Sequence, residues 1–320
     1  MNRKTIRKIL GGFKSYVPGG GHGTMDPGVG GTDSARYCYD VWLKHLSILY
    51  KNGFTKIPNT IAELGPGDSI GTGLAGLVCG SKKFYALDVV KHTNIKNNIS
   101  VFDELVTLFA KHSAMPDDNE FPRVLPRLAS YNFPSEIFTN NNLEKLLDKS
   151  RIQCLRNELV DMEKQKNSIQ YMCPWNDPKI IENDSVDMIF SQAVLEHVKD
   201  LKHTYDAMYK WVKKGGCISN QIDFKSHGLS DEWNGHWSFS DLTWKLIKGN
   251  RPYLINREPL SKHLEAAQDA GFEIILVLPV KTFPSDTYTD TMERDKLAKK
   301  FRNMSEEDFT TTSAYILARK

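Results

Sequence analysis

Short apolar segments alternate along this chain with amphipathic stretches of helical period, and this alternation restricts the fold more than any other feature. The segments that have the character of strands are residues 60–65, 83–90, 168–173, 185–191, 215–224, 272–280 and 311–319. Where strands alternate with helices, right-handed crossovers lay the strands side by side, mostly in parallel, and place helices on both faces of the sheet. The sequence therefore predicts an α/β fold.

Two regions stand outside this alternation. Residues 1–59 contain a loop rich in Gly and Pro, "YVPGGGHGTMDPGVGGTDS", and then a helical pattern, so we predict an N-terminal loop and cap helix. Residues 60–320 are predicted to form one domain. Within it, residues 89–168, about eighty in all, separate the second strand from the third. Ordinary connections are far shorter, so we expect a large helical insertion that covers a site.

Composition excludes several classes of protein. The 42 Lys and Arg nearly balance the 39 Asp and Glu, so no nucleic-acid partner is expected. The five cysteines are scattered and are predicted to be reduced thiols, without a structural metal. Because the sequence has no signal-peptide pattern and no run of about twenty apolar residues, we predict a cytoplasmic protein. The basic segment 1–16 is expected to be a frayed, solvated terminus, with weak contact to an anionic membrane surface as the alternative.

The segment "IAELGPGDSIGTGLAG" places Glu63, Gly65 and Gly67 at the end of the first strand, just before a predicted helix. Glycines let a ligand approach the backbone, and a helix N-terminus offers N–H groups. About twenty residues further on, Asp88 ends the second strand, where a carboxylate accepts hydrogen bonds from both hydroxyls of a ribose. Together these features indicate a nucleoside ligand. For the glycines alone, a tight turn without a ligand is the alternative.

Glu63 distinguishes between two kinds of nucleoside. Its carboxylate would repel a pyrophosphate but suits a cationic ligand. The turn also departs from the pattern G-x-G-x-x-G, because Ile70 stands at the position of the third glycine. A positively charged cofactor is therefore favoured over the dinucleotide of an oxidoreductase.

The segments "AELGPGDSIGTG", "ALD", "CPWND", "SVDMIFSQAVLEHV" and "WVKKGGCISNQIDF" follow one another in this order. From about residue 60 to residue 223 the chain thereby resembles the class I S-adenosylmethionine-dependent methyltransferases. The resemblance implies a Rossmann-like, seven-stranded, mostly parallel sheet with one antiparallel C-terminal strand, and S-adenosyl-L-methionine as cofactor. "SQAVLEHV", "NQIDFKSHGL", "WNGHWSFSD" and "INREPLSKHLEAAQDAGFE" look like a bacterial subgroup often met among enzymes of cell-surface glycan biosynthesis.

The resemblance also implies where the cofactor is held. The implied residues are Glu63, Gly65 and Gly67 at its methionine part, Asp88 at the ribose, Pro174 and Trp175 at the adenine, and Ser191 and Gln192 at the reactive end. Ser69 departs from the family pattern, in which many members have a third glycine at this position. The geometry of the turn is therefore a question for the structure.

Glu196 and His197 are neighbours in the segment after the fourth strand. On an α-helix, adjacent side chains point about 100° apart. We therefore predict that these two residues do not bind one metal ion together, and we expect them to have structural or supporting roles. No metal site is predicted.

Transfer of a methyl group to an alcohol requires a base, because a hydroxyl keeps its proton at neutral pH. The fifth strand ends at "NQIDFKSHG", so Asp223 and His227 are expected at the carboxyl edge of the sheet. We predict His227 as the general base, Asp223 as its orienting partner, and His236 as the competing base. A simple hydrogen bond between Asp223 and His227 explains this pair equally well.

Four further side chains are candidates for binding the acceptor: Trp233, Trp237, Arg257 and Tyr37. The tryptophan pair suits stacking on a sugar ring, and an arginine suits an anionic group. Packing within the protein is the alternative for each of them.

The sequence thus predicts O-methylation of a sugar or another small hydroxylated acceptor in cell-surface glycan biosynthesis. One alternative is an N-methyltransferase of a small metabolite. The other is a non-catalytic, cofactor-binding scaffold whose insertion contacts a partner. The polar residues at the strand ends, Glu63, Asp88, Ser191 and Asp223, argue against a degenerate site.

Overall fold

The computed structural model describes residues 3–16, 31–162, 168–175, 177–251 and 254–320; most of the predicted Gly-rich loop, residues 17–30, lies outside these ranges. One seven-stranded sheet with the order β3-β2-β1-β4-β5-β7-β6 forms its centre. The strands are β1 (Thr60–Leu64), β2 (Lys83–Leu87), β3 (Ile169–Met172), β4 (Val186–Gln192), β5 (Val212–Asp223), β6 (Glu273–Val280) and β7 (Ser313–Arg319). β7 alone among them runs antiparallel to its neighbours, which confirms the predicted fold class.

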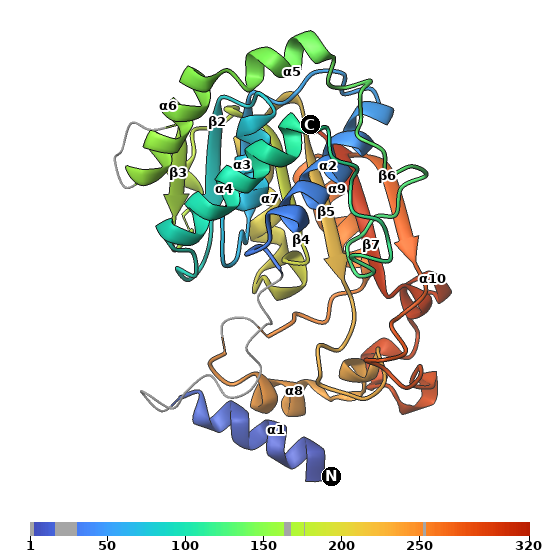
Figure 1. The fold of residues 1–320 in the computed structure, drawn as a ribbon. Helices are drawn as coiled ribbons and strands as arrows, with labels where there is room; N and C mark the ends of the chain where they lie inside the picture. The colour runs from blue at the N-terminus through green and yellow to red at the C-terminus, as the bar shows by residue number, and fades with distance from the viewer. Residues whose placement is uncertain (1–2, 17–30, 163–167, 176, 252–253) are drawn as a thin grey trace.

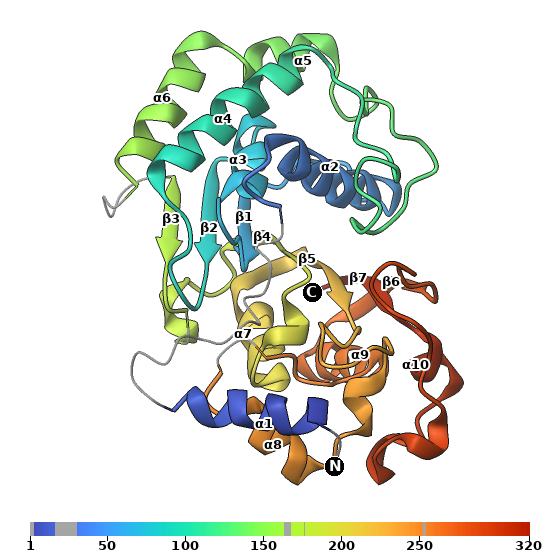
Figure 2. The ribbon, with the colours of Figure 1, turned by 60° about the horizontal axis from the view of Figure 1, so that its bottom comes forward.

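Helices cover both faces of this sheet (Figures 1 and 2). One face carries α2 (Ala35–Lys51), α3 (Gly71–Val78) and α4 (Ile95–Ala110), and the other carries α7 (Leu201–Trp211) and α9 (Leu260–Ala270). Alternation along β1 explains the two layers, because Ile61 faces the first helix layer whereas Ala62 and Leu64 face the second. β1 is therefore buried on both sides, whereas the edge strand β6 is only half-buried.

The predicted insertion consists of α4, α5 (Asn140–Leu146) and α6 (Lys149–Val160), joined by a long segment at residues 111–139. α4 packs against α2, α3 and α6, so it extends one helix layer of the sheet. Residues 111–139 lie against α2 instead: Tyr39 donates to the carbonyl of Ser113 at 2.6 Å, and Lys44 to that of Val124 at 2.7 Å. The insertion thus contributes to the core as well as to the rim of the sheet.

A smaller lobe lies beyond the carboxyl ends of the parallel strands (Figure 1). It contains α1 (Arg3–Lys14), α8 (Asp241–Lys248), α10 (Glu306–Thr310) and 3-10 turns at Gly235–Ser238, Arg294–Lys296 and Lys299–Phe301. Further 3-10 turns are Pro178–Ile180 and Leu195–His197. No helix in the described part of the chain is long and apolar enough to span a membrane.

The N-terminal segment does not form the frayed terminus that its basic sequence suggested. α1 packs on α8, with Ile9 buried and Gly12 in direct contact with the backbone of Leu246. Lys8 donates to the carbonyl of Leu229, and Lys4 pairs with Asp231 at 2.5 Å. The expectation was wrong because the contacts that order α1 come from residues more than two hundred positions away.

Candidate functional site

The glycine turn after β1 is shaped by two residues with positive φ, Gly65 at +65° and Gly67 at +77°. A Cβ atom on Gly65 would lie 2.6 Å from Cγ2 of Val194, so glycine is required both for the backbone conformation and for close packing. Val194 belongs to the segment after β4. The turn predicted to bind a ligand therefore touches the segment that carries Glu196 and His197.

The N-terminus of α3 offers fewer free N–H groups than predicted. Its amides donate within the protein: Ile70 to Asn98 Oδ1 at 3.1 Å, Gly71 to Ser69 Oγ at 3.1 Å, and Gly73 to Glu63 Oε2 at 3.2 Å. Ser69, the departure from the family pattern, also donates its hydroxyl to the carbonyl of Thr32. With these donors already satisfied, the turn is poorly suited to a pyrophosphate, in agreement with the exclusion of a dinucleotide.

Glu63 is buried, and burial raises the pKa of its carboxyl group to about 8, although hydrogen bonds from Gly73 and Thr72 oppose the shift. One of its oxygens is directed at α3 and anchors that helix to the turn. Tyr37 on α2 lies close enough to Glu63 for the carboxylate to affect its titration, and burial raises the pKa of this phenol above its ordinary value. Two predicted site residues are thus brought together beside the glycine turn.

Asp88 has one oxygen engaged and one without a partner. Oδ1 accepts from the amide of Val89 at 2.8 Å, whereas the buried Oδ2 has no hydrogen-bond partner within the described ranges. Burial raises the pKa of this carboxyl group. A buried oxygen without a donor is costly, and a ribose hydroxyl is a donor of the required kind. The Asp88 side chain therefore fits the nucleoside part of the implied cofactor.

Pro174 and Trp175 follow β3 and lie next to Asp88, whose carbonyl accepts from the Trp175 amide at 3.0 Å. Pro174 is exposed. The Trp175 ring is 9% exposed and meets Trp211 edge to face at 5.9 Å, so it belongs mainly to the core rather than flanking an adenine as predicted. Pro174 is the residue of the pair that remains accessible to a ligand.

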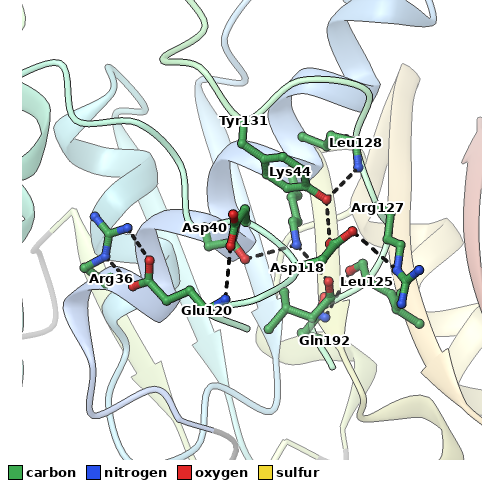
Figure 3. A network of polar contacts seen from close by, with 12 residues as sticks. Arg36, Asp40, Lys44, Asp118, Glu120, Leu125, Arg127, Leu128, Tyr131 and Gln192 are labelled. Atoms are coloured by element: carbon green, nitrogen blue, oxygen red, sulfur yellow. Dashed lines mark hydrogen bonds and ion pairs between the residues drawn. The ribbon is translucent and has the colours of Figure 1, made fainter. Parts of the chain in front are cut away.

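Ser191 and Gln192, predicted at the reactive end, are both directed into the protein. Ser191 is buried and donates to Asn220 Oδ1 at 2.8 Å. Gln192 donates to the carbonyl of Leu125 at 3.2 Å, which joins β4 to the insertion (Figure 3). Ser191 is thus engaged within the sheet, whereas Gln192 Oε1 is buried without a hydrogen-bond partner among the described residues.

A polar network fastens the insertion over α2 (Figure 3). Arg36 forms a pair of hydrogen bonds with Glu120, at 2.5 and 2.6 Å. Deeper in the protein, Lys44 pairs with Asp40 at 3.1 Å, and both side chains are almost fully buried. Residues 111–139 thus cover the Asp40–Lys44 pair and also contact Gln192 at the end of β4. The segment predicted to cover a site therefore also has a structural role.

The prediction that Glu196 and His197 point apart on an α-helix is wrong. Residues Leu195–His197 form a 3-10 turn, and α7 begins only at Leu201. In this turn the ligand atoms of Glu196, His197 and His227 all lie within 4.8 Å of one another. Glu196 is 3% exposed, and burial together with the carboxylate of Asp223 raises its pKa well above the ordinary value.

Asp223 ends β5, as predicted, and its Oδ2 lies 3.6 Å from Nε2 of His227. Its Oδ1 pairs with the Lys225 ammonium at 2.8 Å. Burial would raise the pKa of Asp223, but Lys225 and His227 outweigh that effect and leave it below the ordinary value. Burial lowers the pKa of His227, partly offset by Asp223. At neutral pH the imidazole is therefore neutral and able to accept a proton.

The other candidates for base and acceptor binding lie inside the smaller lobe. The Trp233 and Trp237 rings are 1% and 0% exposed and donate to Thr291 Oγ1 and the Arg257 carbonyl, so neither is available for stacking on a sugar. Arg257 is held by the Phe239 carbonyl and by Asp241, not by an acceptor site. His236 is also buried, and burial lowers its pKa well below the ordinary value.

Three comparisons with known proteins bear on this arrangement. A family model described as a methyltransferase domain matches residues 142–219. No curated protein matches the sequence. Among solved structures, one from Galdieria sulphuraria, assigned as a sarcosine dimethylglycine methyltransferase, is 13% identical, with a TM-score of 0.43, over 86% of this chain and 83% of its own.

Two further structures are similar at the same level. An S-adenosylmethionine-dependent methyltransferase from Mesorhizobium loti is 14% identical, with a TM-score of 0.36, over 82% of this chain and 90% of its own. Phosphoethanolamine N-methyltransferase 2 from Haemonchus contortus, in complex with S-adenosyl-L-methionine, is 16% identical, with a TM-score of 0.39, over 87% of this chain and 52% of its own. Likenesses this distant say nothing about the acceptor.

The matched residues 142–219 run from α5 to the middle of β5 and include the whole of β4. Outside the match, β7 runs antiparallel between β5 and β6, in agreement with the one antiparallel C-terminal strand that the resemblance implied. The unpartnered oxygen of Asp88 and the glycine turn beside it fit the implied cofactor. Residues 142–219 are therefore similar to a methyltransferase domain, and the sheet and the Asp88 side chain agree with the class I S-adenosylmethionine-dependent methyltransferases that the sequence resembles.

Proposed function

We propose that this enzyme methylates a hydroxyl oxygen of a sugar or another small hydroxylated acceptor, as in cell-surface glycan biosynthesis. The observation that carries the proposal is the Asp223–His227 pair at the end of β5, with 3.6 Å between Oδ2 and Nε2. An amine that is already unprotonated needs no base, whereas an alcohol does. A neutral imidazole next to a carboxylate is the arrangement that removes such a proton.

In this proposal the cofactor lies over the glycine turn, with Gly65 and Gly67 beneath its methionine part and Asp88 Oδ2 accepting from a ribose hydroxyl. S-adenosylmethionine supplies an electrophilic methyl group on a positively charged sulfur atom. Glu63 acts indirectly, because it holds the turn against α3 through Gly73.

At the acceptor, Asp223 Oδ2 lies 3.6 Å from His227 Nε2, longer than a hydrogen bond, and would orient the ring once this contact tightens in the acceptor complex, which leaves Nδ1 to take the proton from the attacking hydroxyl. The His227 side chain is 29% exposed, so an acceptor can reach it from solvent. Positioning of the hydroxyl in line with the methyl group contributes the larger part of the rate.

The first test is calorimetry with S-adenosylhomocysteine, followed by a methyl-transfer assay with nucleotide sugars, glycan fragments and small amines. We expect binding of S-adenosylhomocysteine and transfer to a hydroxylated acceptor. Transfer to amines alone would make the enzyme an N-methyltransferase. Binding without transfer to any acceptor would favour the scaffold alternative.

The second test concerns the base. His227→Ala is expected to lower kcat by on the order of a hundredfold with the affinity for S-adenosylhomocysteine unchanged. His203→Ala serves as the matched control, since His203 is exposed on α7. Near-normal turnover in His227→Ala together with loss of turnover in His236→Ala would transfer the role to His236.

A further inference from the structure

The proposed function leaves Glu196 and His197 without a task, although they lie beside the acceptor base. Their ligand atoms and that of His227 lie within 4.8 Å of one another. The rings of His197 and His227 meet edge to face, with centroids 5.1 Å apart and planes at 85°. Three side chains from two segments, one after β4 and one after β5, thus converge on a single point at the carboxyl edge of the sheet.

The Glu196 carboxylate carries the main argument. It is 3% exposed, and neither Oε1 nor Oε2 has a hydrogen-bond partner anywhere in the part of the chain that the structure describes. A buried carboxylate without donors is strongly unfavourable, and such groups in proteins are paired or coordinate a metal. Asp223 has the same sign and adds to the cost, which the charge of Lys225 partly offsets. A cation bound at this point would supply the partner that the Glu196 carboxylate lacks.

Hydrogen bonds from a distant segment of the chain hold the backbone around these three side chains. Asn256 donates its amide to the Glu196 carbonyl at 2.6 Å and its side chain to the Leu195 carbonyl at 2.8 Å. His227 adopts a positive φ of +47°, a strained conformation for a residue with a Cβ, at the point where its ring turns toward Glu196. The surrounding structure thus fixes the positions of the groups that converge.

We propose that Glu196, His197 and His227 bind one divalent transition-metal ion of the zinc type. Two imidazoles and one carboxylate form a ligand set typical of open zinc sites and of related non-heme metals, whereas Mg²⁺ and Ca²⁺ prefer oxygen ligands alone. Ligand atoms in a tetrahedral zinc site lie about 3.4 Å apart, given bond lengths of about 2.1 Å. The observed separations, up to 4.8 Å, are wider than this, so binding of the ion would draw the three ligand atoms together.

The neighbouring residues fit such an ion as well. Metal-ligating histidines usually direct their second ring nitrogen at a carboxylate, and Asp223 Oδ2 lies 3.6 Å from Nε2 of His227. His227 Nδ1 is then the ligand atom. Three protein ligands leave at least one coordination position for a substrate oxygen.

The role of the ion rests on the hydroxylated acceptor of the proposed function and replaces His227 as the base, whereas the binding of the ion rests on neither. A hydroxyl oxygen of the acceptor would donate a lone pair to the ion, which lowers the pKa of the hydroxyl, and its proton would leave to Asp223 or to water. The oxygen lone pair then forms the bond to the methyl carbon as the carbon–sulfur bond breaks and its electron pair stays on sulfur. With the ion bound, His227 is a metal ligand and not the general base. The ion itself lowers the pKa of the acceptor hydroxyl, so no separate base is needed.

The test begins with full-length protein stripped by EDTA and titrated with ZnCl₂ and MnCl₂ in a calorimeter. We expect one ion per chain, and a higher midpoint of thermal unfolding with the ion than without it, because the ion binds the folded state. Glu196→Gln and His197→Ala are each expected to weaken binding by about a hundredfold or more, and His203→Ala should leave it unchanged. Absence of binding, or equal affinity in Glu196→Gln and the wild type, would overturn the proposal.

Co²⁺ provides a second readout that does not depend on affinity. Nitrogen and oxygen ligands give weak visible bands, whereas a thiolate gives an intense near-ultraviolet band, which would place the ion on a cysteine such as the exposed Cys154 and refute the site. S-adenosylhomocysteine affinity, measured on the same samples, separates the two proposals. If the stripped protein binds S-adenosylhomocysteine and methylates without metal, the metal inference fails and the proposed function stands.

Discussion

Asp88 provides the sharpest single-residue test of the cofactor site, because only its Oδ1 is engaged, by the Val89 amide at 2.8 Å. If Oδ2 accepts from a ribose hydroxyl, Asp88→Ala should weaken binding of S-adenosylmethionine by about 1–3 kcal/mol. Calorimetry of the folded variant measures this, with the exposed Glu104→Ala on α4 as the control. Unchanged affinity in a folded Asp88→Ala protein would contradict the assignment.

The raised pKa of Glu63 predicts that the stability of the folded protein depends on pH. Its folded-state pKa of about 8 lies above the value of about 4.5 for a free glutamate, so between these values the folded state binds more protons than the unfolded state. The stabilising contribution is complete below about pH 4.5 and is lost as the pH rises through about 8. Glu63→Gln keeps an acceptor for Gly73 and should flatten this decline in the melting temperature between pH 5 and 9. Parallel curves for the two proteins would show that Glu63 titrates normally.

At the scale of residues, the sequence predicted those positions whose role follows from strand order. Asp88, Asp223 and the glycine turn lie at the carboxyl ends of strands, which parallel topology brings to one edge. Trp233 and Trp237 were misjudged because their burial depends on residues 283–309, far along the chain. The sequence around an aromatic pair does not show whether distant residues bury the pair or leave it exposed.

The buried Lys44–Asp40 pair lies within α2, and Lys44 also donates to the Val124 carbonyl of the insertion, so this side chain makes a prediction at the scale of elements. Lys44→Met leaves the Asp40 carboxylate buried without its partner and should cost about 3–5 kcal/mol of unfolding free energy at pH 7.5. Burial already raises the pKa of Asp40 to about 6, so the loss should be smaller at pH 5, where the carboxyl group is protonated. Urea unfolding at both pH values measures the difference.

Two further variants test the same pair. Asp40→Leu combined with Lys44→Met removes both charges and should recover most of the loss. Arg36→Met, in the partly exposed pair with Glu120, should cost less than about 1 kcal/mol. If Lys44→Met were no more costly than Arg36→Met, the buried pair would not stabilise the insertion.

The elements themselves were largely predictable, and their connections were not. All seven strands and α2 follow from apolar periodicity. In the sequence, Leu195–His197 resembled the start of an α-helix. In the structure these residues form a 3-10 turn, and Asn256, about sixty residues away, donates hydrogen bonds to the carbonyls of Leu195 and Glu196. A long-range contact thus determined whether Glu196 and His197 converge.

At the scale of the whole molecule, the docking of α1 on α8 links the N-terminus to the lobe beyond the carboxyl ends of the strands (Figure 2). Lys8 binds the carbonyl of Leu229, two residues after the proposed base His227. The apolar cluster around Ile9 includes Leu229 and Trp244. We therefore expect α1 to support the loop that carries His227, although it lies far from that loop in sequence.

Two adjacent glycines in α1 allow a matched test of this docking. A Cβ on Gly12 would lie 1.9 Å from the backbone oxygen of Leu246, whereas a Cβ on Gly11 would lie 3.2 Å from the side-chain atom Nη2 of Arg251. Both changes to alanine favour an isolated helix by about 1 kcal/mol, so the difference between them reports the packing alone. Gly12→Ala should be less stable than Gly11→Ala by about 1–3 kcal/mol, and trypsin should cleave α1 faster. Equal melting temperatures and equal cleavage rates would mean that α1 does not dock on α8 in solution.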